Sequence, residues 1–198
     1  MKESQWSDYY KNTIDKEPNE TLVFAANLIK DQPNKHALDI GSGTGSDTIY
    51  LLDQGFKVIA LDQEKNALDI IKNRTSKKQR KNLTLEHRFM QNYTIANNTY
   101  NLINATFSLP FCTKPDFIKI WDNIYKGLKS NGVFSGQIFG TNDDWASIPE
   151  MSFFTNEEID DLIMQYTPEY YIEVDEKGLI ADGSEKHWHM FNIVLRKA

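Results

Sequence analysis

Residues 37–62 read Ala-Leu-Asp-Ile-Gly-Ser-Gly-Thr-Gly-Ser-Asp-Thr-Ile-Tyr-Leu-Leu-Asp-Gln-Gly-Phe-Lys-Val-Ile-Ala-Leu-Asp. The apolar residues at 37–40 predict a short buried strand. Gly41, Gly43 and Gly45 follow directly, and residues without a side chain let the backbone turn tightly and approach a ligand closely. This half of the stretch therefore predicts a strand that runs into a glycine loop.

The second half of the stretch predicts a helix and another strand. Apolar residues at 48–52 form one helical face, and Gly55 just after them marks the end of that helix. Residues 56–61 are almost continuously apolar, which is typical of a strand buried on both faces. This strand ends on a carboxylate, Asp62.

The order strand, glycine loop, helix, strand predicts a nucleoside pocket in an α/β fold. In open parallel sheets, ligands bind beyond the carboxyl ends of the strands, where the strand order reverses. The first helix points free N–H groups and the positive end of its dipole at that place. Asp62 lies about 20 residues from the loop, the separation expected for a ribose-binding acid, and Gln63 is beside it.

Asp39 indicates which nucleoside binds. Dinucleotide sites use Gly-x-Gly-x-x-Gly, whereas this loop has Gly-x-Gly-x-Gly preceded by Asp39. A carboxylate there would repel a pyrophosphate but accept an ammonium group. S-adenosylmethionine (SAM), which ends in an amino acid, fits this requirement. Ser42, between the first two glycines of the loop, is expected to bind this cofactor together with them.

Composition narrows the class of protein. The chain has 198 residues, 40% of them hydrophobic, which suits one globular domain. We expect no membrane association, because no apolar run reaches about 18 residues and the N-terminus lacks a signal-peptide core. The single cysteine, Cys112, excludes an internal disulfide and gives no metal cluster. These features predict a cytoplasmic protein, and the net charge of −6 argues against nucleic-acid binding.

Residues 1–32 are expected to form a helical lid or cap on a domain that spans 33–198. Trp6 and Tyr10 stand in a polar segment at its start. They could belong to a helix that caps the sheet, or to a lid whose aromatic rings attract the sulfonium of SAM.

Residues 72–81 contain six cations in ten positions. A nucleic-acid patch is one interpretation of such a run. The run precedes the third strand, however, so the topology places it at the edge of the sheet opposite the pocket. A solvated turn is the favoured interpretation.

The third and fourth strands, predicted at 83–89 and 100–106, bring polar groups to the same edge. Gln91 and Asn92 follow the third strand, and their amides could meet the adenine edge. Asn104 lies at the end of the fourth strand, where we expect it to face the methionine part of the cofactor.

The rest of the chain predicts a core helix and three more strands. Phe117, Ile120, Trp121, Ile124 and Leu128 form a regular core stripe. A turn at 129–132 leads into a fifth strand at 133–139, and the polar loop 140–145 follows on the active face. Thr155 and Glu158 predict a capping box. Strands at 170–174 and 188–196 then form an antiparallel hairpin.

His187 and His189 flank Trp188 just before the last strand. Three interpretations remain open: a metal site, a pair at the hairpin edge, or substrate contact with proton transfer near neutral pH. A metal site would need further ligands to converge from elsewhere, so no metal is expected.

The pattern Asp39-x-Gly-x-Gly-x-Gly45 followed by Asp62 resembles motif I and the acidic motif of the class I SAM-dependent methyltransferases. The chain as a whole resembles small bacterial methyltransferase-domain proteins of the tellurite-resistance-like group. This resemblance implies one α/β domain with a Rossmann-like, seven-stranded, mostly parallel sheet of order 3-2-1-4-5-7-6. The last strand should be antiparallel, with helices on both faces.

The resemblance also implies in-line methyl transfer from SAM to a small-molecule acceptor, which leaves S-adenosylhomocysteine. The protein should be a monomer or a weak homodimer. His187 and His189 are the candidates for a catalytic base, although none is obligatory. Two alternatives remain: an NAD-dependent oxidoreductase, and a non-catalytic SAM sensor or partner-binding module. The residues predicted to form the acceptor pocket are Trp6, Phe107, Pro110, Phe111, Phe139 and Trp145.

Overall fold

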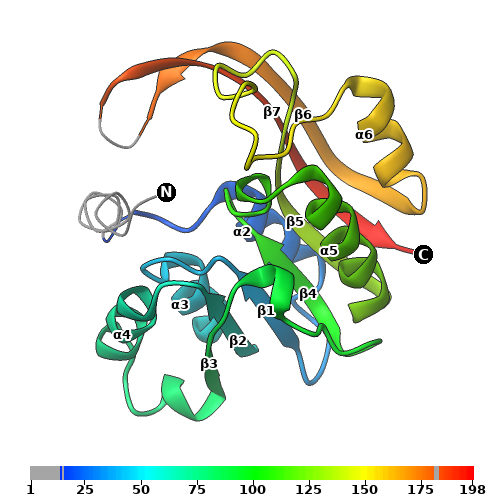
Figure 1. The fold of residues 1–198 in the computed structure, drawn as a ribbon. Coiled ribbons are helices and arrows are strands. Elements are labelled where there is room, and N and C mark those ends of the chain that lie inside the picture. The colour runs from blue at the N-terminus through cyan, green and yellow to red at the C-terminus, as the bar shows by residue number, and fades with distance from the viewer. Residues whose placement is uncertain (1–13, 15, 181–182) are drawn as a thin grey trace.

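The computed structural model describes residues 14, 16–180 and 183–198, so Trp6 and Tyr10 lie outside the described residues. A seven-stranded sheet forms the centre of the molecule (Figure 1). Its strands are β1 (His36–Ile40), β2 (Lys57–Asp62), β3 (Leu83–His87), β4 (Tyr100–Ala105), β5 (Leu128–Phe139), β6 (Tyr166–Leu179) and β7 (Glu185–Lys197).

The strand order is β3-β2-β1-β4-β5-β7-β6, which confirms the predicted fold. Strands β1 to β5 pair in parallel, and β7 runs antiparallel to both β5 and β6. β1 pairs with β2 on one side and with β4 on the other. The strand order therefore reverses at β1, where the glycine loop leaves the sheet.

Helices cover both faces of the sheet (Figure 1). Apolar side chains of α2 and α3 pack with Ala37 and Val58 on one face, and those of α5 and α6 pack with Leu38 and Ile103 on the other. The helices are α2 (Glu20–Leu28), α3 (Ser46–Asp53), α4 (Lys65–Arg74), α5 (Lys114–Gly127) and α6 (Asn156–Ile163), with 3-10 turns η1 (Gln79–Asn82), η2 (Met90–Asn92) and η3 (Leu109–Phe111).

Four residues of the predicted core stripe, Phe117, Ile120, Trp121 and Ile124, are buried on α5, whereas the fifth, Leu128, is buried as the first residue of β5. The Thr155–Glu158 capping box at α6 is also confirmed. Inside the sheet, alternate residues face opposite helix layers, which explains why β1, β2 and β4 are almost continuously buried.

Some predicted boundaries were wrong. Residues 129–132 form part of β5 instead of a separate turn: the register slips between Tyr100 and Leu102 of β4, and the extra β5 residues form an irregularity in the strand. The last hairpin is also longer than predicted. β6 begins at Tyr166 instead of residue 170, because pairing with β7 extends to both ends of the hairpin.

The basic run at 72–81 is largely exposed, as the solvated interpretation expects. Arg74 is the exception. Its guanidinium donates a 2.6 Å hydrogen bond to the carbonyl of Thr44 in the glycine loop, so the start of the run supports the loop from behind. Among the described residues, no helix has the length and apolar character needed to cross a membrane.

Candidate active site

A cleft of about 1410 Å³ lies at the carboxyl ends of β1, β2 and β4, beside the glycine loop. Single-ligand pockets typically measure ~300–1,000 Å³. Side chains and backbone from the loop, from the segments after β2, β3 and β4, and from residues 145–151 line the cleft. The elements that line it meet at the strand-order reversal.

The glycine loop depends on two close backbone contacts. Gly41 has φ +71°, and a Cβ there would lie 2.4 Å from Cβ of Ser108. Gly45 has φ +88°, and its Cβ would lie 2.6 Å from Cγ1 of Ile71 on α4. Since both positions also lie in the left-handed region, only glycine fits them without strain. Close packing against Ser108 and Ile71 therefore explains why glycine is required at positions 41 and 45, even without a ligand.

Ser42 lies inside the loop and lines the cleft, where the sequence predicts it. Its N–H donates a 3.0 Å hydrogen bond to the carbonyl of Leu61, which ties the loop to the end of β2. The side chain is buried, and its hydroxyl has no hydrogen-bond partner among the described residues. Because buried polar groups are normally paired, this unpaired hydroxyl is unusual.

Asp62 joins the glycine loop to the start of α4. Its Oδ2 accepts a 2.8 Å hydrogen bond from the Gly43 N–H, and its Oδ1 accepts one of 2.8 Å from the Glu64 N–H. The side chain is buried yet lines the cleft. Burial raises its pKa, and the backbone hydrogen bonds oppose that shift. Each carboxylate oxygen has a further lone pair for a ligand hydroxyl.

A buried polar cluster lies beneath the loop. Asp39 Oδ2 accepts a 2.5 Å hydrogen bond from the Thr48 hydroxyl, and its Oδ1 accepts one of 2.9 Å from the Asn104 amide. The same amide donates to Asp47 Oδ2 at 3.0 Å. Burial, followed by repulsion from Asp47, raises the pKa of Asp39 to about 7. The cleft floor therefore holds two neighbouring acids with no described cation between them.

Asn104 was predicted to face the cofactor. It is fully buried, and among the described residues it is not part of the cleft lining. Its Oδ1 accepts a 2.7 Å hydrogen bond from the Ser135 hydroxyl, which fixes the amide so that its NH₂ group points at both acids. The structure thus places Asn104 behind Asp39 and Asp47.

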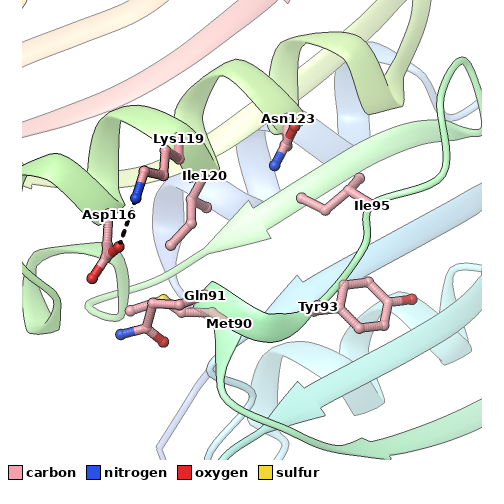
Figure 2. Close-up of a pocket in the computed structure, with 8 residues that line it drawn as sticks. All are labelled: Met90, Gln91, Tyr93, Ile95, Asp116, Lys119, Ile120 and Asn123. Carbon is pink, nitrogen blue, oxygen red and sulfur yellow. Dashed lines mark ion pairs between the residues drawn. The ribbon is translucent and has the colours of Figure 1, made fainter.

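At the other end of the cleft, Gln63 and Gln91 are exposed and line it, whereas Asn92 is exposed but is not among the described lining residues. Gln91 also borders a second pocket, between η2 and α5 (Figure 2). That pocket has a volume of about 30 Å³, enough for about one water molecule. A nucleoside fits only the larger cleft.

An aromatic wall forms the end of the cleft nearest β5. Phe107, Phe111 and Trp145 line it together with Ile148 and Met151. Phe107 has φ +45°, and its N–H donates a 3.0 Å hydrogen bond to the Gln137 side chain, which holds this strained backbone in place.

Pro110 and Phe139 were also predicted in this wall. Both are buried, and the described cleft lining does not include them. The Phe139 ring lies 6.3 Å from that of Phe111 and 6.4 Å from that of Trp145, so it supports the wall from behind. Cys112 lines the cleft, but burial raises the pKa of its thiol to about 12, which leaves it protonated near pH 7.

His187 and His189 are not among the described residues that line the cleft. They lie on β7, and each ring pairs with an acid of β6. His187 Nε2 is 2.5 Å from Asp175, and His189 Nε2 is 3.0 Å from Glu173. Of the three interpretations, this arrangement is closest to a histidine pair at the hairpin.

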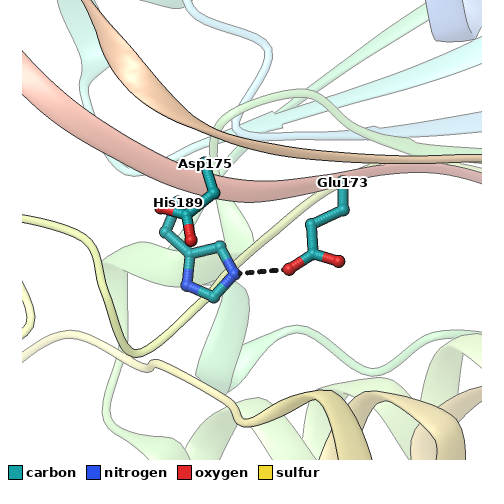
Figure 3. Close-up of side chains that lie close together, drawn as sticks. All are labelled: Glu173, Asp175 and His189. Atoms are coloured by element: carbon teal, nitrogen blue, oxygen red, sulfur yellow. Dashed lines mark hydrogen bonds and ion pairs between the residues drawn. The ribbon is translucent and has the colours of Figure 1, made fainter.

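Glu173, Asp175 and His189 lie close enough together to suggest a metal site (Figure 3). The hydrogen bonds argue against it. Nδ1 of the buried His189 accepts a 3.0 Å hydrogen bond from the Asn142 N–H, so Nδ1 carries no proton and Nε2 carries one toward Glu173. A ligating histidine requires the opposite arrangement, with its free nitrogen donating.

Sequence reasoning missed several cleft residues. Asp47, in the first turn of α3, looks like an ordinary partner of the helix dipole. Ser108 contacts Gly41 only because β4 lies beside β1. Ile148, Glu150 and Met151 come from a loop without regular structure, and no periodic signal identifies such residues.

Comparisons with known proteins agree with this geometry. A family model described as a methyltransferase domain matches residues 37–132. The search of curated proteins found no match.

Solved structures share the fold. TehB from Haemophilus influenzae has a TM-score of 0.74 at 19% identity, over 98% of this chain and 67% of that one. A Burkholderia thailandensis 1,6-didemethyltoxoflavin-N1-methyltransferase was solved with 1,6-didemethyltoxoflavin and S-adenosylhomocysteine bound. Its TM-score is 0.66 at 18% identity, and the match covers 98% of this chain and 86% of that one. A SAM-dependent methyltransferase from Methanosarcina mazei has a TM-score of 0.66 at 15% identity, and the match covers 92% of this chain and 99% of that one.

The strand order and the cleft at its reversal define the class I methyltransferase fold. Residues 37–132 match the methyltransferase-domain family, and the chain as a whole shares its fold with solved SAM-dependent methyltransferases.

Proposed function

We propose that this chain transfers the methyl group of SAM to a small-molecule acceptor bound in the same cleft. One observation carries the proposal: the glycine loop with Asp62 and the aromatic wall of Phe107 and Trp145 line one continuous space. A nucleoside held at one end therefore presents its other end to the wall.

The residues around the base and ribose fit SAM. Asp62 would accept hydrogen bonds from the ribose hydroxyls, and Gln63 and Gln91 would flank the base. The unpaired hydroxyl of Ser42 would add a polar contact from the loop itself.

The residues beneath the loop fit the amino-acid end of SAM. Asp39 and Asp47 would lie below it, where an ammonium group would offset the repulsion that raises the pKa of Asp39. The N-terminus of α3 would meet the carboxylate. Asn104 would act indirectly, by orienting both acids.

The aromatic wall would hold the acceptor. Phe107, Phe111 and Trp145 present flat, apolar surface to the cleft, with Phe139 packed behind them, while Pro110 is buried. An aromatic wall of this kind suits a small, partly apolar molecule. The 1,6-didemethyltoxoflavin-N1-methyltransferase, which shares this fold, is a methyltransferase with a small-molecule acceptor.

Bound SAM supplies a methyl group on a positively charged sulfur, which is already electrophilic. The protein's contribution is alignment: the loop fixes the nucleoside, and the wall orients the acceptor so that its lone pair points at the methyl carbon. Such positioning removes much of the entropic barrier. The predicted role of His187 or His189 as a base stays a prediction, because their rings face acids of β6.

Calorimetry with SAM and with NAD tests the cofactor. We expect micromolar binding of SAM and of S-adenosylhomocysteine, and no binding of NAD. Preferential binding of NAD would instead support an oxidoreductase and overturn the proposal.

A panel of thiols, amines, phenols and chalcogen oxyanions tests the reaction, with S-adenosylhomocysteine measured as the product. We expect product to accumulate with at least one class of acceptor. Tight SAM binding without turnover across the whole panel would favour a SAM sensor.

We further propose that the protein works in the cytoplasm as a monomer or weak homodimer, with residues 33–198 as the catalytic domain and 1–32 as its cap. The acidic net charge of −6 and the single cysteine support this setting. Light scattering on the purified protein tests the oligomeric state.

A further inference from the structure

A lysine ammonium is buried in an aromatic box next to the acceptor wall. The side chain of Lys186, on β7, is 4% exposed. Its Nζ lies 3.6 Å from the ring centroid of Trp145, 3.9 Å from that of Trp188 and 5.4 Å from that of Phe139. Such distances are within cation–π range, and the attraction is strongest where water is excluded.

Asp143 completes the box. Its side chain is fully buried and forms an ion pair with Lys186. The same carboxylate accepts hydrogen bonds from the Trp145 N–H at 3.0 Å and from the His189 N–H at 3.2 Å. One buried charge pair therefore touches the loop, the strand and the indole at once.

The loop that carries Trp145 is held to β7 by further hydrogen bonds. The Gly140 N–H donates to the His189 carbonyl at 2.7 Å, and the Asp144 N–H donates to the His187 carbonyl at 3.1 Å. The His187 N–H in turn donates to the Asp144 carboxylate at 2.7 Å. These bonds fix the loop backbone, whereas the Lys186 ammonium contacts the indole face itself.

We propose that Lys186 is a positioning residue: its ammonium, paired with Asp143, fixes the Trp145 ring in the acceptor wall of the cleft. This inference rests on the proposed function, because Trp145 lines the cleft at its acceptor end. An apolar side chain could fill the same space, but it would leave Asp143 charged and unpaired. Only a cation both neutralises Asp143 and attracts the two indole faces.

Chemical rescue tests this role. Lys186→Ala removes three methylenes and the ammonium, and propylammonium replaces those atoms. We expect the melting temperature of the variant to fall by roughly 5 °C or more, because one partner of a buried pair is lost. Millimolar propylammonium should restore much of that loss, and 1-propanol at equal concentration should not. The additional change Asp143→Asn should abolish the rescue.

Acrylamide quenching of tryptophan fluorescence measures how exposed Trp145 is. The signal of the other tryptophans is measured in matched proteins that carry Trp145→Phe and is subtracted. We expect at least twofold stronger quenching of Trp145 in Lys186→Ala, reversed by propylammonium. With an acceptor from the panel, its KM should rise at least fivefold while the Kd of SAM stays within twofold. Lys177→Ala, which removes an exposed ammonium of the same hairpin, is the matched control.

Unchanged quenching of Trp145, or equal rescue by 1-propanol, would overturn the proposal. If Lys186→Ala does not fold, the same quenching measurement is made on Lys186→Met, which keeps a side chain of similar length but removes the charge. Quenching needs no acceptor, so this result is independent of whether methyl transfer is found.

Discussion

Asp62 has two roles that a single substitution separates poorly, because its oxygens hold the Gly43 and Glu64 N–H groups besides any ribose. We expect Asp62→Ala to weaken SAM binding by about 100-fold, as two charge-assisted hydrogen bonds to a ligand are worth roughly 3 kcal/mol. Calorimetry measures the effect. Asp122→Ala, which removes an exposed carboxylate from α5, should leave the affinity unchanged.

Asp39 gives the cofactor-free protein a defined pH dependence. Its pKa in the folded state is about 7, above the ordinary value of 3.8, so protonated Asp39 favours folding. That contribution is complete below about pH 4 and is lost as the pH rises through about 7. We expect wild type to lose on the order of 2 kcal/mol relative to Asp39→Asn between pH 5 and pH 8.

Urea unfolding at several pH values measures this difference. Burial also raises the pKa of Asp62, so the comparison with Asp39→Asn is needed to isolate Asp39. If the free energy of unfolding depends on pH in the same way for both proteins, Asp39 ionises at an ordinary pKa, which would contradict the buried acidic pair proposed beneath the loop.

At the scale of elements, the junction of the glycine loop and α3 depends on Gly45. Gly45→Ala should cost roughly 2–4 kcal/mol, since its Cβ would meet Ile71 and its φ is +88°. Gly55 is the matched control: it has φ +81°, but no atom lies within 4 Å of its would-be Cβ. Gly55→Ala should therefore show the backbone strain alone, about 1–2 kcal/mol.

Thermal or urea unfolding measures both variants. If Gly45→Ala and Gly55→Ala lower the free energy of unfolding equally, the Ile71 side chain on α4 can move aside, and close packing does not fix the loop.

The sequence predicted elements well where the signal was local. The loop between β1 and α3, the end of β2 at Asp62 and the apolar face of α5 depend on neighbours in the chain, and the structure has each of them where it was predicted. Boundaries set by pairing were missed. Lys186 and Arg74 were missed too, because a cation in a strand or a basic run predicts exposure, and only the fold shows their partners Asp143 and Thr44.

For the molecule as a whole, the charge distribution predicts that the protein does not bind nucleic acid. The basic run at 72–81 is mostly solvated, and the net charge is −6. We expect no shift of a 20-nucleotide DNA or RNA in a gel assay at about 150 mM salt, because extended phosphate binding needs a basic face. Binding that weakens steeply with salt would contradict this prediction.

The sheet order was predicted from the resemblance to the class I methyltransferases, and the structure confirms it. The alternation of strands and helices by itself narrows the possible topologies but does not fix one order. The acceptor wall was predictable only in part. Phe107, Phe111 and Trp145 line the cleft, whereas Phe139 packs behind them and Pro110 is buried outside the described lining. Which face of a chain turns toward a cleft depends on neighbours distant in sequence, and residues 145–151 have no regular periodicity to indicate it.

A crystal structure with S-adenosylhomocysteine tests the central claim most directly. The account predicts the ribose at Asp62, the amino group above Asp39 and Asp47, and the sulfur facing Phe107 and Trp145. A ligand bound elsewhere, or a ribose with no contact to Asp62, would contradict it.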